Sequence, residues 1–376
     1  MNPAVSNFTI VKQVSLIFFI WVLTINIFAL FVGNRLNVMT DSAYWWSGYQ
    51  TAVDNHTWDL TSYHARWDSE WYLDIAENGY AFLGPEKLSN VVFFPLYPGL
   101  MWLASFLFSG NFALAGWILS LIFLFLALYY FYKLIKEFHS EIQPIVPIIF
   151  LLIFPTSFFL NAVYTEALFM FLSIASFYYA RKNNFLAASI FGLLASLTRV
   201  TGLLLFVPLL WEYFTNNGIK SFSLKKFLPI FLVPLGTAGF FLFHYIRYGD
   251  FLLFLKIQAW WGRSFELNKD HFQTLTHPAT VNLIMDSLFV IFAVATMYVA
   301  FRRIRVSYGL YMLVTLIVAL STGTFMSIGR YILVLFPMYI VIASTKNQHI
   351  HKAYSFASIL FLAMYTMLFV TGYWAG

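Results

Sequence analysis

The chain has 376 residues, of which 61% are hydrophobic and only 10% are charged, and its net charge is +6 at pH 7. A soluble domain of this size needs about a quarter of its residues charged, so the composition excludes a soluble protein and predicts an all-α polytopic membrane protein. The absence of Cys excludes disulfide frameworks, thiolate nucleophiles and Cys-ligated metal sites.

The first apolar segment long enough to cross a bilayer covers residues 13–33. No small-residue cleavage site follows it, so we expect a retained membrane anchor and not a signal peptide. Residues 34–90 are the least hydrophobic stretch and hold eight acidic residues against three basic ones. We therefore predict a long extracytoplasmic loop over residues 34–111.

Residues 93–108 either cross the membrane or lie in its interface as a helix broken by proline. The rest of the chain, 112–373, is expected to hold the remaining membrane helices of a single membrane domain that covers 1–376. These spans are predicted at about 112–132, 144–161, 163–180, 185–198, 200–214, 227–246, 281–301, 306–322, 330–345 and 353–373.

The positive-inside rule distinguishes the two placements of residues 93–108. If they do not cross and the N-terminus is cytoplasmic, the cytoplasmic segments hold 13 basic and 3 acidic residues, and the charges are +10 inside and −4 outside. If they cross, the cluster Arg302, Arg303 and Arg305 falls outside, against the rule. We therefore predict about 11 spans with a cytoplasmic N-terminus, and we expect no nucleic-acid partner for the basic excess.

Residues 66–80, RWDSEWYLDIAENGY, hold the first candidate site. Their apolar residues recur at helical spacing, which predicts an amphipathic helix on the outer surface that ends at Gly79. Asp68 lies at its start, where the helix dipole stabilises a carboxylate, and this fits both an N-cap and a catalytic residue. The neighbouring residues favour the catalytic role of Asp68. Glu70 completes an acidic pair beside Arg66, and Trp67 suits a sugar face or a lipid headgroup.

The other candidates are ionisable residues beside apolar spans. Glu166, two residues after Tyr164, is a functional hypothesis by default in such surroundings, although a helix-start charge is the alternative. The short spans 185–198 and 200–214 are expected to form a bent pair with Arg199 at its corner. Arg199 and Arg330 are lone cations that either reach lipid phosphates or clamp a substrate phosphate with their guanidinium groups. Arg263, in the second outer loop, either touches an anionic lipid or is solvated.

Five segments resemble, in chain order, motifs of the PIG-V-like mannosyltransferases, the GPI second-mannose transferase family of the glycosyltransferase C superfamily. They are RWDSEWYLDIAENGY, FFPLYPGL, FPTSFFLNAVYTEALF, LTRVTGLLLFVPLL and GRYILVLFP. The resemblance implies a helical bundle with interfacial helices in the first outer loop, a catalytic aspartate at Asp68 and a polyprenyl-phosphate sugar donor. Glu70 stands where the family pattern has His. The composition is typical of a bacterial plasma-membrane protein. Because bacteria generally lack GPI anchors, the resemblance does not identify the acceptor.

The resemblance implies an inverting glycosyltransferase that moves a hexose, with mannose expected, to an acceptor hydroxyl of a lipid or glycan on the extracytoplasmic face. Asp68 would be the general base, and a divalent cation at Asp68 and Glu70 is a weaker prediction. The alternatives are a lipid-linked sugar flippase, a secondary transporter and a protein O-mannosyltransferase. The predicted substrate-binding residues are Arg66, Trp67, Glu70, Tyr164, Glu166, Arg199 and Arg330.

Overall fold

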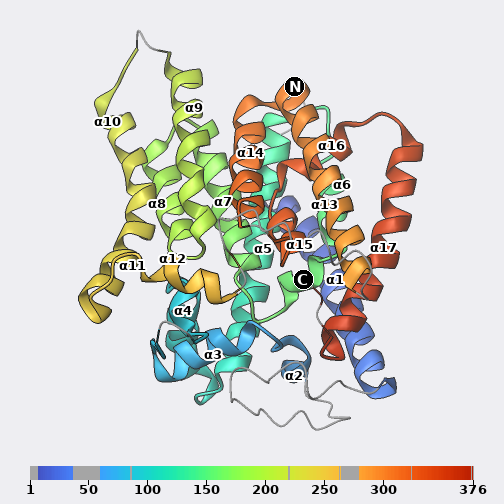
Figure 1. Cartoon of the computed structure of the whole chain (residues 1–376). Coiled ribbons are helices and arrows are strands. Elements are labelled where there is room, and N and C mark those ends of the chain that lie inside the picture. Colours follow the sequence, from blue (N-terminus) through green and yellow to red (C-terminus); the bar gives the residue numbers. More distant parts are fainter. Residues whose placement is uncertain are drawn as a thin grey trace. The chain divides into compact units, whose positions relative to one another are not determined.

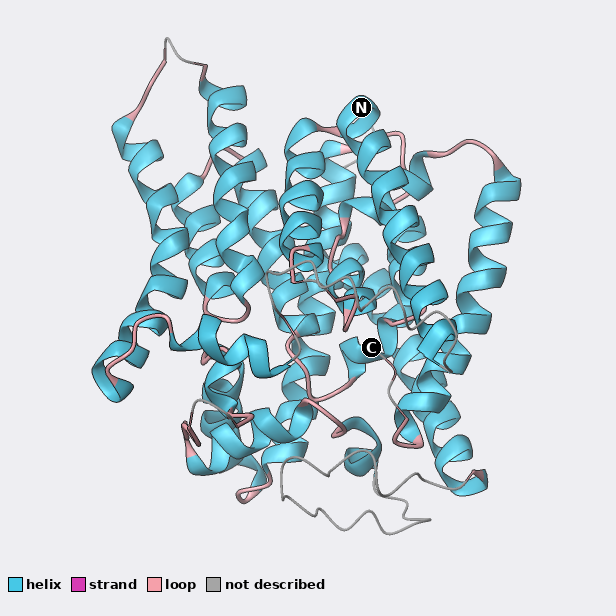
Figure 2. Ribbon diagram, in the orientation of Figure 1, coloured by secondary structure: helices cyan, strands magenta, loops and turns pink. Residues whose placement is uncertain are grey.

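The fold is helical throughout the part of the chain that the structure describes. Every regular element in this part is an α-helix, a 3₁₀-helix or a π-turn (Figure 2). The predicted all-α class is therefore confirmed for these residues, whereas residues 37–59 of the predicted outer loop lie outside them. The computed structural model describes residues 7–36, 60–84, 87–218, 221–261, 263, 279–322, 324–373 and 375.

Five helical stretches in this described part are long and apolar enough to cross a bilayer. Each coincides with a predicted span, and together they support an integral membrane protein. The remaining predicted spans coincide with shorter helices, so the number of 11 stays a prediction. The five are α1 (Asn7–Arg35), α5 (Phe112–Phe138), α10 to α11 (Leu224–Phe227 and Leu232–Tyr248, joined by η5, Leu228–Phe231), α13 (Ala279–Val299) with η8 (Ala300–Ile304), and α17 (Gln348–Val370) (Figure 1).

Two predicted spans are interrupted near proline residues. The segment predicted at 144–161 consists of α6 (Ile145–Leu152) and the 3₁₀-helix η3 (Ser157–Asn161), with Pro155 between them. The segment predicted at 330–345 consists of α15 (Ile328–Leu333) and α16 (Pro337–Ser344). Proline has no amide hydrogen to continue a preceding helix but fits the first position of a new one, which explains the start of α16.

The segment with two possible placements forms α4 (Leu96–Ser105) and the 3₁₀-helix η2 (Phe106–Phe108). Ten helical residues and three 3₁₀ residues rise roughly 20 Å, against about 30 Å of hydrocarbon in a bilayer. The interfacial placement of this segment stays a prediction.

The chain divides into two compact units, and the first comprises residues 1–78, 97–178 and 342–375. In this unit α1 packs against both α5 and α17 (Figure 1). The helix α7 (Glu166–Arg181) is enclosed, because every residue at 154–178 is buried. A helix that is apolar and buried on all sides is typical of the centre of a bundle.

Two short helices of the predicted outer loop belong to this unit, α2 (Leu60–His64) and α3 (Ser69–Asn78). Tyr63 of α2 lies in an apolar cluster with Val32 of α1 and Val370 of α17. Gly33 makes room for it, since a Cβ at that position would lie 2.4 Å from the Tyr63 ring. The predicted end of α3 is confirmed, because Gly79 follows it with φ +83°, in the left-handed region.

The second unit comprises residues 79–96 and 179–341. Its α8 (Phe185–Ser196) packs against α11, and the 3₁₀-helix η4 (Val200–Leu205) leads directly into α9 (Phe206–Asn217). Arg199 therefore lies at the corner between α8 and η4, as the sequence predicted. The other elements of this unit are η1 (Asn90–Val92), α12 (Leu253–Gln258), η6 (Ala259–Trp261) and α14 (Val306–Leu320).

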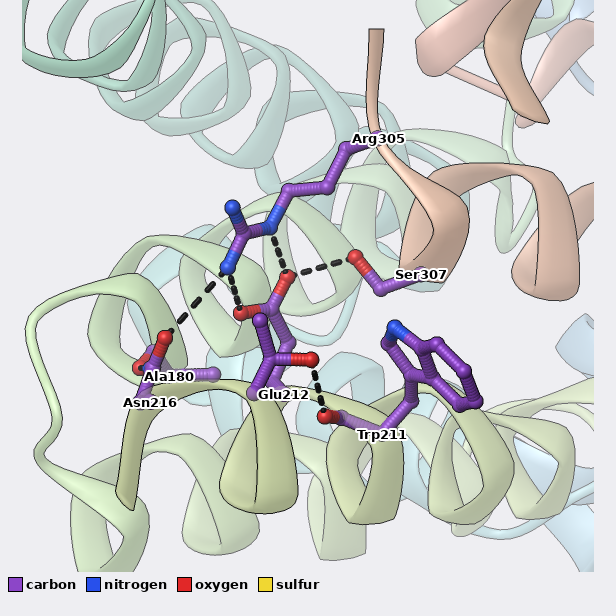
Figure 3. A network of polar contacts seen from close by, with 7 residues as sticks. Ala180, Trp211, Glu212, Asn216, Arg305 and Ser307 are labelled. Atoms are coloured by element: carbon purple, nitrogen blue, oxygen red, sulfur yellow. Dashed lines mark hydrogen bonds and ion pairs between the residues drawn. The ribbon is translucent and has the colours of Figure 1, made fainter. Parts of the chain in front are cut away.

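A buried ion pair fastens α9 to the junction between η8 and α14 (Figure 3). Glu212 is fully buried, and its two oxygens accept from Nε and Nη2 of Arg305 at 2.5 and 2.6 Å. The Ser307 hydroxyl donates to the same carboxylate at 2.5 Å. The predicted topology places both residues on one side of the membrane, with two predicted spans between them.

Candidate functional site

Asp68 lies in a tight turn between α2 and α3, with buried residues on both sides. Arg66 is 0% exposed and Glu70 is 1% exposed, and Trp67 and Ser69 are buried as well. The Asp68 side chain is only partly buried. Of the three charged residues in this turn, Asp68 is therefore the one that keeps access to its surroundings.

The residue before Asp68 has an unusual backbone conformation. Trp67 has φ +56°, in the left-handed region, which costs a bulky L-residue roughly 1–2 kcal/mol. The Tyr164 hydroxyl spans this residue, because it donates to the Arg66 carbonyl at 2.9 Å and accepts from the Asp68 amide at 3.1 Å. Backbone strain held in place by its surroundings is common at functional sites. Here it determines where the Asp68 backbone lies.

The side chains of the turn are also tied to the end of α17. Arg66 Nη2 donates to the Val370 carbonyl at 3.2 Å, and Trp67 Nε1 donates to the Tyr373 carbonyl at 3.1 Å. The sequence indicated neither contact, because the partner is a backbone carbonyl more than 300 residues away. Arg66 and Trp67 thus have structural partners, and their predicted contacts with substrate stay predictions.

The segment around Glu166 packs against the elements that carry the turn. Glu166 begins α7 and is 0% exposed, and the helix dipole stabilises a carboxylate at that end. Thr165 Oγ1 lies 3.4 Å from the Tyr72 hydroxyl of α3, and Ser120 of α5 donates to the Tyr164 carbonyl at 3.4 Å. The first unit therefore holds six of the predicted site residues, namely Arg66, Trp67, Asp68, Glu70, Tyr164 and Glu166.

His64, two residues before Arg66, is a buried polar residue whose role the sequence did not reveal. Asn26 Nδ2 donates to the Val22 carbonyl at 2.8 Å, so Asn26 Oδ1 is the acceptor for His64 Nε2–H at 2.6 Å. The ring stacks on Trp117 with 5.2 Å between centroids. Burial, together with the nearby Arg66 charge, lowers the pKa of His64 to about 3. The available signal was Asn26, a polar residue within an apolar span.

The neutral state of His64 predicts a loss of stability in acid. The unfolded chain binds a proton at His64 below about pH 6.5 and the folded protein only near pH 3, so this contribution is complete above pH 6.5 and decreases as the pH falls. The free energy of unfolding should fall by up to about 1.4 kcal/mol per pH unit in this window. Melting temperatures in detergent between pH 8 and 4 should therefore fall more steeply for the wild type than for His64→Gln. Equal slopes of melting temperature against pH in the two proteins would contradict the lowered pKa of His64.

The second unit gathers arginine side chains around one phenol ring. The guanidinium carbon of Arg199 lies 5.2 Å from the Tyr331 ring centroid, and that of Arg263 lies 5.8 Å from it. Arg263 Nη1 also donates to the Tyr331 hydroxyl at 3.2 Å. Arg330 precedes Tyr331 on α15, is 4% exposed, and interacts electrostatically with the same phenol.

Arg199 and Arg330 both belong to this unit and both interact electrostatically with Tyr331, as does Arg263, so the predicted clamp stays a prediction. Guanidinium groups bind phosphate oxygens through two parallel hydrogen bonds, and several of them near one point suit an anion. The sequence left Arg263 undecided because 68 residues separate it from Tyr331.

No group of three or more His, Cys, Asp or Glu side chains suited to a metal ion occurs within the described ranges. The divalent cation predicted at Asp68 and Glu70 stays a prediction. Two carboxylates do not complete a coordination shell, so such an ion would need further oxygen ligands, for example from a substrate phosphate.

No protein-family model, curated protein or solved structure matches this chain. The resemblance to the PIG-V-like mannosyltransferases therefore stays a prediction that depends on the five motifs.

Proposed function

We propose that this protein is an inverting glycosyltransferase of the glycosyltransferase C type, with about 11 membrane helices and an extracytoplasmic site in a bacterial plasma membrane. It transfers a hexose, with mannose expected, from a polyprenyl-phosphate donor to a lipid or glycan hydroxyl. The observation that carries the proposal is the accessible Asp68 carboxylate in a buried turn held by Tyr164. A general base must reach its substrate and be held in place, and this turn meets both requirements. The motif resemblance supplies the reaction type.

Asp68 is assigned the proton transfer in a single displacement. The acceptor oxygen attacks the anomeric carbon of the donor while its proton passes to the Asp68 carboxylate. The bond between the anomeric carbon and the phosphate oxygen breaks, and the polyprenyl phosphate leaves with the bonding electrons. Attack on the face opposite the phosphate inverts the configuration at the anomeric carbon.

We assign the predicted pair Arg199 and Arg330, together with Arg263, to the binding of the donor phosphate. The leaving phosphate gains negative charge as the glycosidic bond breaks, and positioned cations stabilise that charge. Arg199 and Arg263 place their guanidinium groups over the Tyr331 ring, and Arg330 interacts electrostatically with the same phenol.

Removal of these cations should weaken donor binding. Hydrogen bonds to charged groups contribute about 1.5–3 kcal/mol, so Arg199→Ala and Arg330→Ala should each raise the Kd for the polyprenyl-phosphate donor by about tenfold or more. Fluorescence titration of the protein in detergent with the donor measures the Kd. Arg303→Ala, which removes an exposed cation from η8, should leave it unchanged. Unchanged affinity in both cluster variants would refute the clamp.

One incubation tests the reaction itself. Purified protein in liposomes of bacterial membrane lipids is supplied with polyprenyl-phosphate-[14C]mannose, and the labelled products are separated by chromatography. Label in a lipid or glycan supports the proposal, and label in a protein indicates the O-mannosyltransferase. Movement of the labelled donor across the bilayer without any transfer product would replace the proposal by a flippase or transporter.

A further inference from the structure

The chain makes a defined turn directly after α17. Gly372 has φ +84°, its amide donates to the Phe369 carbonyl at 3.1 Å, and the Tyr373 amide donates to the Leu368 carbonyl at 2.8 Å. These two bonds form a Schellman motif, in which glycine is favoured because the left-handed position disfavours a Cβ. The motif determines where the Tyr373 carbonyl lies.

The end of α17 offers acceptors that the helix itself does not use. The last four carbonyls of an α-helix have no partner within it, and a cation at this end is stabilised by the helix dipole. The buried Arg66 guanidinium donates to one of them, that of Val370, at 3.2 Å. The Trp67 indole donates to the Tyr373 carbonyl beyond the Schellman turn at 3.1 Å.

Trp67 is therefore held through its backbone and through its side chain. Tyr164 binds the peptide groups on either side of it, and Tyr373 binds its indole. A tryptophan with φ +56° would return to a more favourable conformation if these contacts were lost, and the Asp68 backbone would move with it. The indole contact is thus expected to contribute to the position of Asp68.

We propose that residues 370–373 are a positioning element for Asp68 and that Trp67 is the positioning residue through which they act. This inference rests on the proposed function in that it takes Asp68 to be the base. Loss of the indole contact should displace the base and lower the turnover number, while the binding of donor and acceptor is largely retained.

Two substitutions test the contact from its two ends. Trp67→Phe removes the indole donor and keeps an aromatic ring, and Gly372→Ala disfavours the Schellman turn that places the acceptor. Each is expected to lower kcat at least tenfold, with KM changed by less than about threefold. Trp67→Gly accepts a positive φ without strain but lacks the indole. Its kcat should also be low, which would show that the indole contact, and not the backbone strain alone, is needed for turnover.

Gly249→Ala is the matched control for Gly372→Ala. Gly249 follows α11 with φ +74°, and a Cβ there would meet no atom within 4 Å. The backbone penalty is therefore of the same kind, and the control should lower the melting temperature similarly with kcat unchanged. Wild-type kcat in Trp67→Phe, or an equal loss of kcat in Gly249→Ala and Gly372→Ala, would overturn the inference.

A spectroscopic measurement separates this inference from the proposed function. The indole 15N–1H resonance of Trp67 is identified by its loss in Trp67→Phe, and it should shift in Gly372→Ala but not in Gly249→Ala. If the wild type transfers no sugar, the proposed function fails, and the shift still establishes or refutes the anchor. An unshifted resonance in Gly372→Ala refutes the anchor whatever the activity.

Discussion

Replacement of Asp68 by Asn is expected to lower the turnover number for sugar transfer by about 10²- to 10⁴-fold, the range of general-base catalysis. The amide has nearly the same shape as the carboxylate but cannot take up the proton of the acceptor hydroxyl. The substitution changes a partly exposed side chain, so the protein should remain folded. Turnover is measured with labelled polyprenyl-phosphate-mannose, and the melting temperature in detergent reports the fold.

Asp74→Asn is the matched control for this substitution. Asp74 lies on the same helix, α3, where its carboxylate accepts from Asn78 Nδ2 at 3.0 Å. The substitution should weaken the local hydrogen bond from Asn78, and turnover should stay at the wild-type level. Wild-type turnover in Asp68→Asn would remove Asp68 as the base, and equal losses in the two variants would show an effect on the helix instead.

Glu212→Gln should cause a large loss of stability while it spares the proposed sites. The change leaves the Arg305 guanidinium without its charged partner next to a fully buried position, which costs about 3 kcal/mol. The Ser307 hydroxyl also loses its charged acceptor. Equilibrium unfolding in detergent, or the melting temperature, measures the loss. Turnover per folded molecule should be unchanged.

A double-mutant cycle separates the ion pair from general disruption of α9. Glu212→Leu with Arg305→Met replaces both charges by apolar side chains, and buried pairs replaced in this way often regain most of the stability. The double variant is therefore expected to be more stable than Glu212→Gln. The single variants of the cycle are Glu212→Leu and Arg305→Met. A double variant that is less stable than either of them would show that stability at this site depends on packing and not on the charge pair.

Local properties of the sequence predicted much of the fold. Span length and apolar composition predicted the five long helices, because a helix that satisfies its own backbone in an apolar medium needs no distant partner. Gly79 predicted the end of α3, and the corner between α8 and η4 was expected at Arg199. The break after α6 was missed, because an apolar segment near Pro155 has the composition of a continuous span.

The candidate site was predicted as a set of residues but not as an arrangement. The sequence selected Asp68 and Tyr164, and the structure adds that Tyr164 binds the two peptide groups around Trp67. It also adds Arg263 to the predicted arginine pair, through the Tyr331 ring. Neither relation leaves a local pattern, since each depends on the approach of residues far apart in the chain.

The sequence by itself determined the membrane class, the helical elements and the choice of Asp68 as the candidate base. These follow from composition, periodicity and charge, which are properties of neighbouring residues. Only the tertiary structure decided that Trp67 takes a left-handed conformation and that the end of α17 holds its indole. A strained backbone persists only where distant groups hold it, and 306 residues separate this donor from its acceptor.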